Sequence, residues 1–232
     1  FLLLGDLGPR TYMQVFEAEA AALGHADVMQ ADAMFDAAIG QLLRLQAIAP
    51  PADLPAYDDA LLARELRLFD EWFLGRHLGV ALDCDDLETL DLVYRRLIDA
   101  ALSAPQGLGH RAFMPRNLMP LEAPAGREAG PAVLDFQDAV RGPIAYDALS
   151  LFKDAFWSWP EDRVDTWLAR YHARAAEAGL PVPEWTRFRR DADWIGVQRH
   201  LKVMGIFARL HHRDAKPRDI ADAPRFLAYL DG

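Results

Sequence analysis

The sequence has few of the residues on which several classes of protein depend. Cys84 is its single cysteine, so no intrachain disulfide and no thiolate metal cluster can form, which fits a reducing cytoplasm. No run of eighteen apolar residues occurs, so we expect no membrane span. Lysine occurs three times, and 25 basic residues face 35 acidic ones. The net charge of −10 argues against non-specific nucleic-acid binding, which needs a basic face.

Apolar periodicity dominates what the sequence does contain. The chain has 232 residues, of which 52% are hydrophobic, enough to bury a sizeable core. After Asp58, for example, Leu62, Leu66, Phe69 and Phe73 recur at the helical spacings of four, three and four. Comparable patterns predict helices over 12–23, 27–43, 86–102, 146–157, 161–178, 193–211 and 222–230. We therefore expect a mainly helical protein.

Residues 106–147 differ from the helical segments around them. Glycine and proline are frequent, and two short apolar runs lie around 118–119 and 132–134. These runs predict a small β-hairpin that brackets polar loops. Binding and catalytic residues are concentrated on loops held by a rigid scaffold, so we expect the site here.

Asn117 and Asp135 each lie beside one of these apolar runs. If the runs pair, an amide oxygen and a carboxylate converge on one point, and such ligands suit Mg²⁺. The alternative from the residues alone is that Asn117 caps a turn and Asp135 is a surface acid.

The order His110-Arg111, then Asn117 and later Asp135-Phe136, resembles a kinase catalytic loop followed by its metal-binding aspartate. The stretch through Gly142 and Asp147 is similar to the aminoglycoside phosphotransferase superfamily. Three segments narrow the resemblance to the bacterial N-acetylmuramate/N-acetylglucosamine anomeric kinases of cell-wall recycling. They are Phe136-Gln137-Asp138, Trp72-Phe73-Leu74 and 198–207.

The resemblance implies a protein-kinase-like fold and roles for particular residues. Asn117 and Asp135 would bind the Mg²⁺ that bridges the phosphates of ATP, His110 would brace the catalytic loop, and Asp147 would accept backbone hydrogen bonds from it. The nucleotide would contact Leu4, Asp6, Leu7, Met119 and Leu134.

The same resemblance divides the chain. Residues 1–8 would be the last strand of an N-terminal lobe and the connector between lobes, and 9–232 a helical C-terminal lobe. That lobe would hold the catalytic loop at 110–117 and the metal-binding segment at 135–138. The first lysine is Lys153, after the metal-binding aspartate, so we expect the N-terminal lobe to be absent from this sequence.

Ala112 departs from the family pattern, which has the catalytic aspartate at this position. A methyl group cannot accept the proton of an attacking hydroxyl, so we expect slow phosphate transfer. Because the rest of the loop is intact, a single inactivating substitution is favoured over natural decay. The alternative is a non-catalytic pseudokinase in which alanine is the natural residue.

The candidates for the acceptor pocket are polar or aromatic residues near the loop or on other helices. They are Glu71, Trp72, Arg116, Gln137, Asp138, Gln198 and His200. Each of them could instead have a purely structural position. Trp72 could belong to the core, Glu71 could lie at a solvated helix end, and His200 could lie on the surface. His211 and His212 suggest a metal site, but adjacent side chains on a helix point apart, which disfavours it.

The predicted activity is ATP-dependent phosphorylation of an amino sugar, N-acetylmuramate or N-acetylglucosamine, at its anomeric hydroxyl in peptidoglycan recycling. The nearest alternative is the same chemistry on another hydroxyl acceptor, such as an aminoglycoside or a choline-like alcohol. An acidic protein with phosphorylated ligands must concentrate positive charge locally, and a muramyl acid would favour arginine in the pocket.

Overall fold

The computed structural model describes residues 5–23, 28–121, 130–216 and 219–231. Most of them are helical, and the β structure consists of two small antiparallel pairs. The elements in chain order are α1 (Tyr12–Leu23), α2 (Val28–Gln46), α3 (Asp59–Leu68), the π-helix η1 (Phe69–His77), α4 (Cys84–Ser103), β1 (Gln106–Gly109), the short 3₁₀-helix η2 (Pro115–Asn117), β2 (Leu118–Met119), β3 (Ala132–Val133), β4 (Val140–Pro143), α5 (Ala145–Phe152), α6 (Glu161–Glu177), α7 (Trp185–Asp214), the 3₁₀-helix η3 (Asp219–Asp222) and α8 (Ala223–Asp231). The mainly helical prediction is confirmed.

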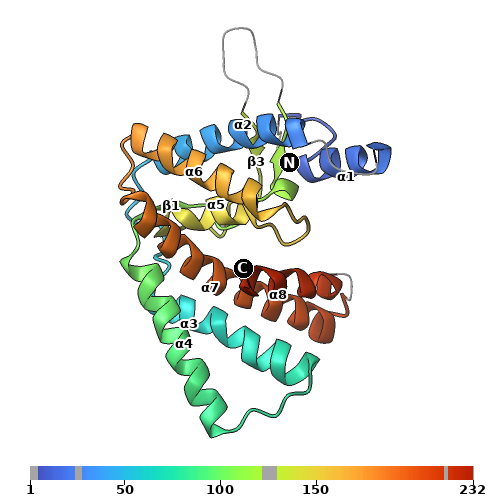
Figure 1. The fold of residues 1–232 in the computed structure, drawn as a ribbon, viewed down its shortest axis with the longest axis vertical. Helices are drawn as coiled ribbons and strands as arrows, with labels where there is room; N and C mark the ends of the chain where they lie inside the picture. The colour runs from blue at the N-terminus through green and yellow to red at the C-terminus, as the bar shows by residue number, and fades with distance from the viewer. Residues whose placement is uncertain (1–4, 24–27, 122–129, 217–218, 232) are drawn as a thin grey trace.

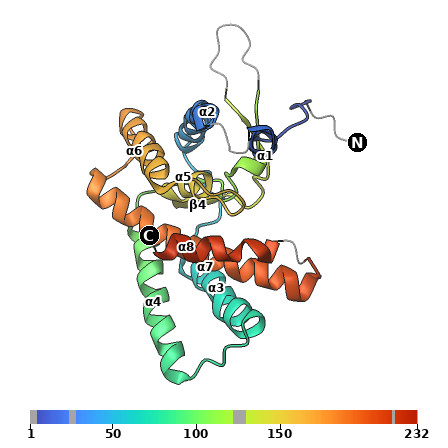
Figure 2. The ribbon, with the colours of Figure 1, turned by 45° about the vertical axis from the view of Figure 1, so that its right-hand side comes forward.

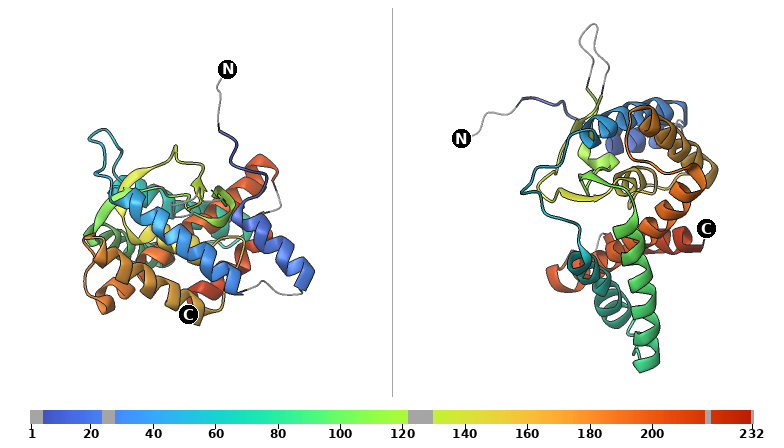
Figure 3. Two further views of the ribbon diagram at one scale, coloured as in Figure 1. Left: turned by 90° about the horizontal axis from the view of Figure 1, so that it is seen from above. Right: turned by 90° about the vertical axis from the view of Figure 1, so that its left-hand side faces the viewer.

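The long helix α7 organises the molecule. Figure 1 shows α7 and α8 side by side across the middle, with α1, α2, α5 and α6 on one side and α3 and α4 on the other. Figure 2 keeps this arrangement after a 45° turn. In the right-hand view of Figure 3, the green helix α4 extends away from the remaining helices. Accordingly, Leu97 and Ile98 near its C-terminal end are buried, whereas Leu92 is exposed.

Aromatic side chains fill the main core on the α2, α5 and α6 side. The ring of Phe35 lies 4.6 Å from that of Trp167 and 5.7 Å from those of Phe16 and Phe152, at steep angles. Edge-to-face contacts of this kind add to the free energy of burying large rings. The cluster fixes α5, and α5 in turn carries Asp147 beneath the predicted catalytic loop.

The predicted helices are present, and local hydrogen bonds set the bounds that differ. Asp58 caps α3 by accepting from Leu61 N, but the periodic run through Phe73 winds as the π-helix after Leu68. The helix expected over 146–157 ends at Phe152, because Asp154 accepts the N–H groups of Phe156 and Trp157 in a turn. Helix α7 begins at Trp185, eight residues earlier than predicted, with Glu184 as its cap.

Two strand pairs hold the loop-rich centre. The predicted hairpin is confirmed, with Leu118 opposite Val133 and Met119 opposite Ala132. The pair β1–β4, which joins Gln106–Gly109 to Val140–Pro143, was not predicted. Glycines within both strands weaken the sequence signal of a strand. Of the described helices, none combines the length and apolar character that crossing a membrane requires.

Candidate active site

Asn117 and Asp135 meet at the open end of the hairpin. Leu134 N–H donates to Asn117 O at 2.9 Å, which extends the β2–β3 pairing by one residue and brings Asp135 beside Asn117. The Asn117 amide nitrogen lies 2.9 Å from Ala112 O and 3.2 Å from Asp135 Oδ2, so both of its hydrogens are engaged. Among the described residues the amide oxygen accepts no hydrogen bond, and the neighbouring Asp135 carboxylate is exposed. This donor set fits a hard divalent cation such as Mg²⁺.

The loop that leads to Asn117 rests on a buried carboxylate. Asp147, 1% exposed, accepts hydrogen bonds from His110 N at 2.7 Å and Arg111 N at 2.8 Å. Burial raises the pKa of Asp147 to about 6, against the lowering effect of these two bonds. Ala112 N donates to His110 Nδ1 at 3.2 Å. The support that the family resemblance implied for Asp147 is therefore present.

Arg111 and Asp135 both have left-handed backbones, with φ of 68° and 71°. Such a backbone costs about 1–3 kcal/mol at a residue with a bulky side chain and persists only when its surroundings fix it. At Arg111 the backbone is fixed by Asp147, and the guanidinium forms an ion pair with Glu65 and lies 4.8 Å from the centre of the Tyr57 ring. Of the described non-glycine residues with positive φ, these two lie at the ends of the candidate site, and the third, Ala215, ends helix α7.

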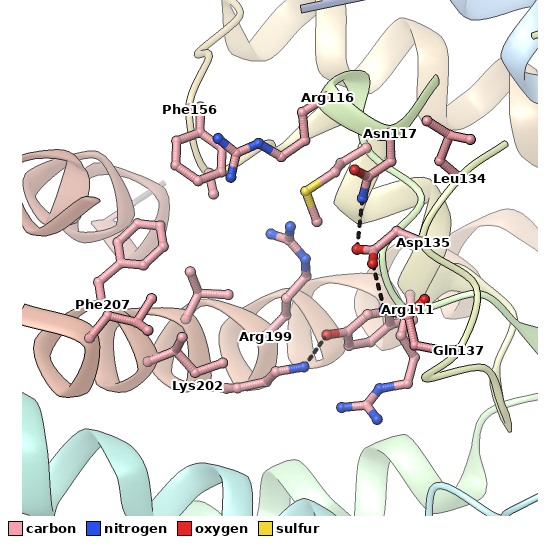
Figure 4. Close-up of a pocket in the computed structure, with 16 residues that line it drawn as sticks. Arg111, Arg116, Asn117, Leu134, Asp135, Gln137, Phe156, Arg199, Lys202 and Phe207 are labelled. Atoms are coloured by element: carbon pink, nitrogen blue, oxygen red, sulfur yellow. Dashed lines mark hydrogen bonds between the residues drawn. The ribbon is translucent and has the colours of Figure 1, made fainter. Parts of the chain in front are cut away.

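A cavity of about 760 Å³ opens beside Asn117 and Asp135. Figure 4 shows their side chains on one wall and α7 forming the opposite wall. The lining residues with polar side chains are Arg111, Arg116, Asn117, Asp135, Gln137, Tyr146, Arg199 and Lys202, and apolar ones such as Phe156 and Phe207 complete it. The cavity lining thus contains four cationic side chains and one carboxylate, although the net charge of the whole chain is −10. The predicted local concentration of positive charge is present, and it suits anionic ligands.

The structure separates the predicted site residues into two groups. Arg116, Asn117, Leu134, Asp135 and Gln137 line this cavity, and Gln137 donates to Asp135 Oδ1 at 2.6 Å. Asp6 and Leu7 line a second cavity with Pro120 and Leu121, next along the chain from Met119; Leu4 lies outside the described residues.

The other acceptor candidates do not line the main cavity. Glu71 is exposed on η1, Trp72 packs partly buried against a second apolar cluster, and Asp138 is exposed. Gln198 is buried and donates to Tyr57. His200 is 2% exposed, so the surface alternative for it is wrong; burial first, and then the charges of Arg199 and Lys153, hold its pKa well below the usual value.

Arg199 and Lys202 are the charged α7 residues that line the cavity, and the sequence analysis did not propose them as site residues. Arg199 is anchored by donating to Ser150 Oγ at 2.8 Å and to the carbonyl of Lys153 at 3.0 Å. Lys202 donates to Tyr146 at 2.9 Å. The spacing of the residues along α7 could have identified them. The residues of α7 that line the cavity recur at helical intervals on one face, at positions 199, 202, 203, 206, 207 and 210.

Comparison with known sequences points to the same family as the motif of His110, Asn117 and Asp135. The family model described as "Phosphotransferase enzyme family" matches residues 2–190. The chain is 50% identical over 232 residues to the N-acetylmuramate/N-acetylglucosamine kinase of Pseudomonas putida and 42% identical over 231 residues to that of Neisseria meningitidis. The alignment with the first relative includes all of this chain, and the alignment with the second includes 99% of it. The chain spans only 64% of the length of the first relative and 66% of the length of the second. The resemblance expected from the sequence is confirmed.

Solved structures agree on the fold. The Plasmodium vivax ethanolamine kinase superimposes with a TM-score of 0.58 at 14% identity, over 85% of this chain and 58% of that one. An ADP-bound aminoglycoside phosphotransferase gives 0.53 at 17% identity, over 98% and 70%. At such identities the likeness concerns the fold alone, which is kinase-like.

Proposed function

This chain belongs to the phosphotransferase enzyme family, and from that premise we propose that the protein transfers phosphate from ATP to an N-acetylated amino sugar. The acceptor is N-acetylmuramate or N-acetylglucosamine, as in the names of the relatives, and the phosphorylated group is the anomeric hydroxyl. The observation that carries the proposal is the convergence of Asn117 and Asp135 at the mouth of a cationic cavity.

Asn117 and Asp135 would hold Mg²⁺ through the amide oxygen and the carboxylate. When bound, the ion would offset negative charge on the phosphates of ATP. The chain's own contribution is positional: Asn117 is fixed by its bond to Ala112 O, and Asp135 by its bonds from Asn117 and Gln137. Residues 1–8 would form the last strand of an N-terminal lobe and the connector between lobes, and 9–232 the helical C-terminal lobe.

The charge of the cavity favours an anionic acceptor over a cationic one. Arg111 and Lys202 are partly neutralised by Glu65, to which Lys202 Nζ lies 3.5 Å away. Arg116 instead has its guanidinium 3.6 Å from the centre of the Phe156 ring, a contact that holds it in place without cancelling its charge. Arg116 is therefore suited to a carboxylate such as that of the muramyl acid, and a choline-like or aminoglycoside acceptor would meet repulsion.

Alanine at position 112 limits the rate of phosphate transfer. Its carbonyl accepts from Asn117 and its N–H donates to His110, so the backbone at 112 is held and would fix the direction of a larger side chain. An aspartate there would accept the proton of the attacking hydroxyl, and general-base help is worth roughly 10²–10⁴ in rate.

The test compares three forms of the full-length protein: unchanged, Ala112→Asp, and Ala112→Asn as a control of the same size without a base. We expect kcat for N-acetylmuramate with ATP and Mg²⁺ to rise about 10²–10⁴-fold in Ala112→Asp alone. Equal rates in the Asp and Asn forms would refute the assignment of position 112. A panel of N-acetylmuramate, N-acetylglucosamine, an aminoglycoside and choline, tested on Ala112→Asp, separates the acceptor classes.

A further inference from the structure

Three histidines from two distant segments meet on the surface of the helical body. His77 is the last residue of η1, and His211 and His212 lie in the last turn of α7. One ring nitrogen of each lies within 4.8 Å of the others, and His77 Nδ1 is 3.4 Å from His212 Nε2. The expectation that His211 and His212 point apart is wrong, because their ring centres lie 4.6 Å from each other and both rings contact His77.

The spacing of these nitrogens matches that around a shared metal ion. Zn–N bonds of about 2.0–2.1 Å in a tetrahedral site place neighbouring nitrogens about 3.3–3.4 Å apart. His77 and His212 already have this separation. His211 Nδ1 is buried and has no hydrogen-bond partner among the described residues. In the part of the chain that the structure describes, no other group of three His, Cys, Asp or Glu side chains is close enough to share an ion.

The π-helix η1 sets the direction in which the His77 side chain leaves the backbone. The backbone below it is π-helical, with Leu78 N–H bonded to Phe73 O five residues back. This winding sets the face on which His77 emerges, and π-helical turns are frequent at functional sites.

We propose that His77, His211 and His212 bind one divalent transition-metal ion such as Zn²⁺, with the fourth position left to water. Imidazole is a common ligand of Zn²⁺ and its neighbours, whereas Mg²⁺ prefers oxygen, so this site is chemically distinct from that of Asn117 and Asp135. The ion would tie η1 to the end of α7. Leu210, the residue before His211, lines the main cavity, so the ion would hold in place the end of α7 that forms part of that wall.

The proposal is tested on the untagged, full-length protein after treatment with a chelator. We expect calorimetric titration with ZnSO₄ to show one ion bound per chain, and Mg²⁺ at equal concentration to show none at this site. A hundredfold excess of Zn²⁺ over its Kd should raise Tm by about 5–10 °C, because the ion binds only the folded state.

Two ligand variants and one control identify the residues. His77→Asn and the exposed His212→Asn should each weaken Zn²⁺ binding at least about tenfold. His172→Asn, which changes a histidine on α6 bonded to Pro183 O, should bind as the unchanged protein does. Folding of each variant is checked by circular dichroism. Failure of the folded protein to bind Zn²⁺, or equal affinity in the folded His212→Asn variant, would show that the three rings form a hydrogen-bonded cluster only.

Discussion

Gly205 is the position at which a single methyl group should do most damage to the fold. It lies in α7 against the end of α3, where a Cβ would come within 2.6 Å of Leu68 Cβ and closer still to the Leu68 carbonyl group. Real Cβ atoms do not approach other atoms so closely, and backbone atoms cannot rotate away. Helix α7 would have to move away from α3 and η1.

Gly196, nine residues earlier in the same helix, provides the matched control. A Cβ there would meet Leu149 Cδ1 at 3.8 Å, an ordinary van der Waals contact. Alanine is favoured over glycine in a helix by about 1 kcal/mol, so Gly196→Ala should stabilise the protein by about 0.5–1 kcal/mol. At Gly205 the same preference is outweighed, since forced overpacking costs about 1–3 kcal/mol and more when backbone must shift. We expect a net loss of about 2 kcal/mol.

Thermal and urea unfolding of the full-length protein measure both changes. For a chain of this size, about 2–4 °C of Tm corresponds to 1 kcal/mol, so Gly205→Ala should lower Tm by about 4–8 °C and Gly196→Ala should raise it by about 1–4 °C. Because α7 carries Arg199 and Lys202, Gly205→Ala should also weaken ligand binding in the main cavity. If Gly205→Ala were as stable as Gly196→Ala, the close packing of α7 on α3 would be refuted.

Two further predictions concern buried hydrogen bonds. The folded protein keeps the proton on Asp147 up to about pH 6, whereas the unfolded chain loses it near pH 4, so this group's contribution to stability falls as pH rises through that window. Relative to the non-titrating Asp147→Asn variant, the free energy of unfolding should fall by about 2 kcal/mol between about pH 4.5 and pH 7, and a constant difference in urea unfolding would contradict the shifted pKa. Tyr171→Phe removes a buried hydroxyl that donates to Gln46 Oε1 at 2.6 Å and should cost about 1–3 kcal/mol. Arg95→Ala, which removes an exposed ion pair with Asp59, should cost less than about 1 kcal/mol in the same assay, and equal losses would contradict this ranking.

Patterns of short range could be predicted from the sequence. The periodic apolar positions after Asp58 identified α3, and the two apolar runs identified the hairpin with Leu118 opposite Val133. That hairpin alone brings Asn117 beside Asp135, because both residues adjoin paired strands. Each of these features depends on hydrogen bonds and side-chain spacing within one element or one strand pair.

Positions that depend on packing between elements were not predictable in this way. Gln198 and His200 were selected from α7, yet Arg199 and Lys202 face the cavity. The face that α7 turns toward the cavity depends on its packing against other elements, including α3, where Gly205 lies against Leu68.

The sequence by itself determined the helical class, the loop that carries Asn117 and the family to which the chain belongs. These features depend on residue types at separations of a few positions along the chain. Only the tertiary structure decided that Glu65 joins Arg111 and Lys202, and that His77 meets His211 and His212. Those contacts join residues far apart in the chain, and their geometry follows from how whole helices pack.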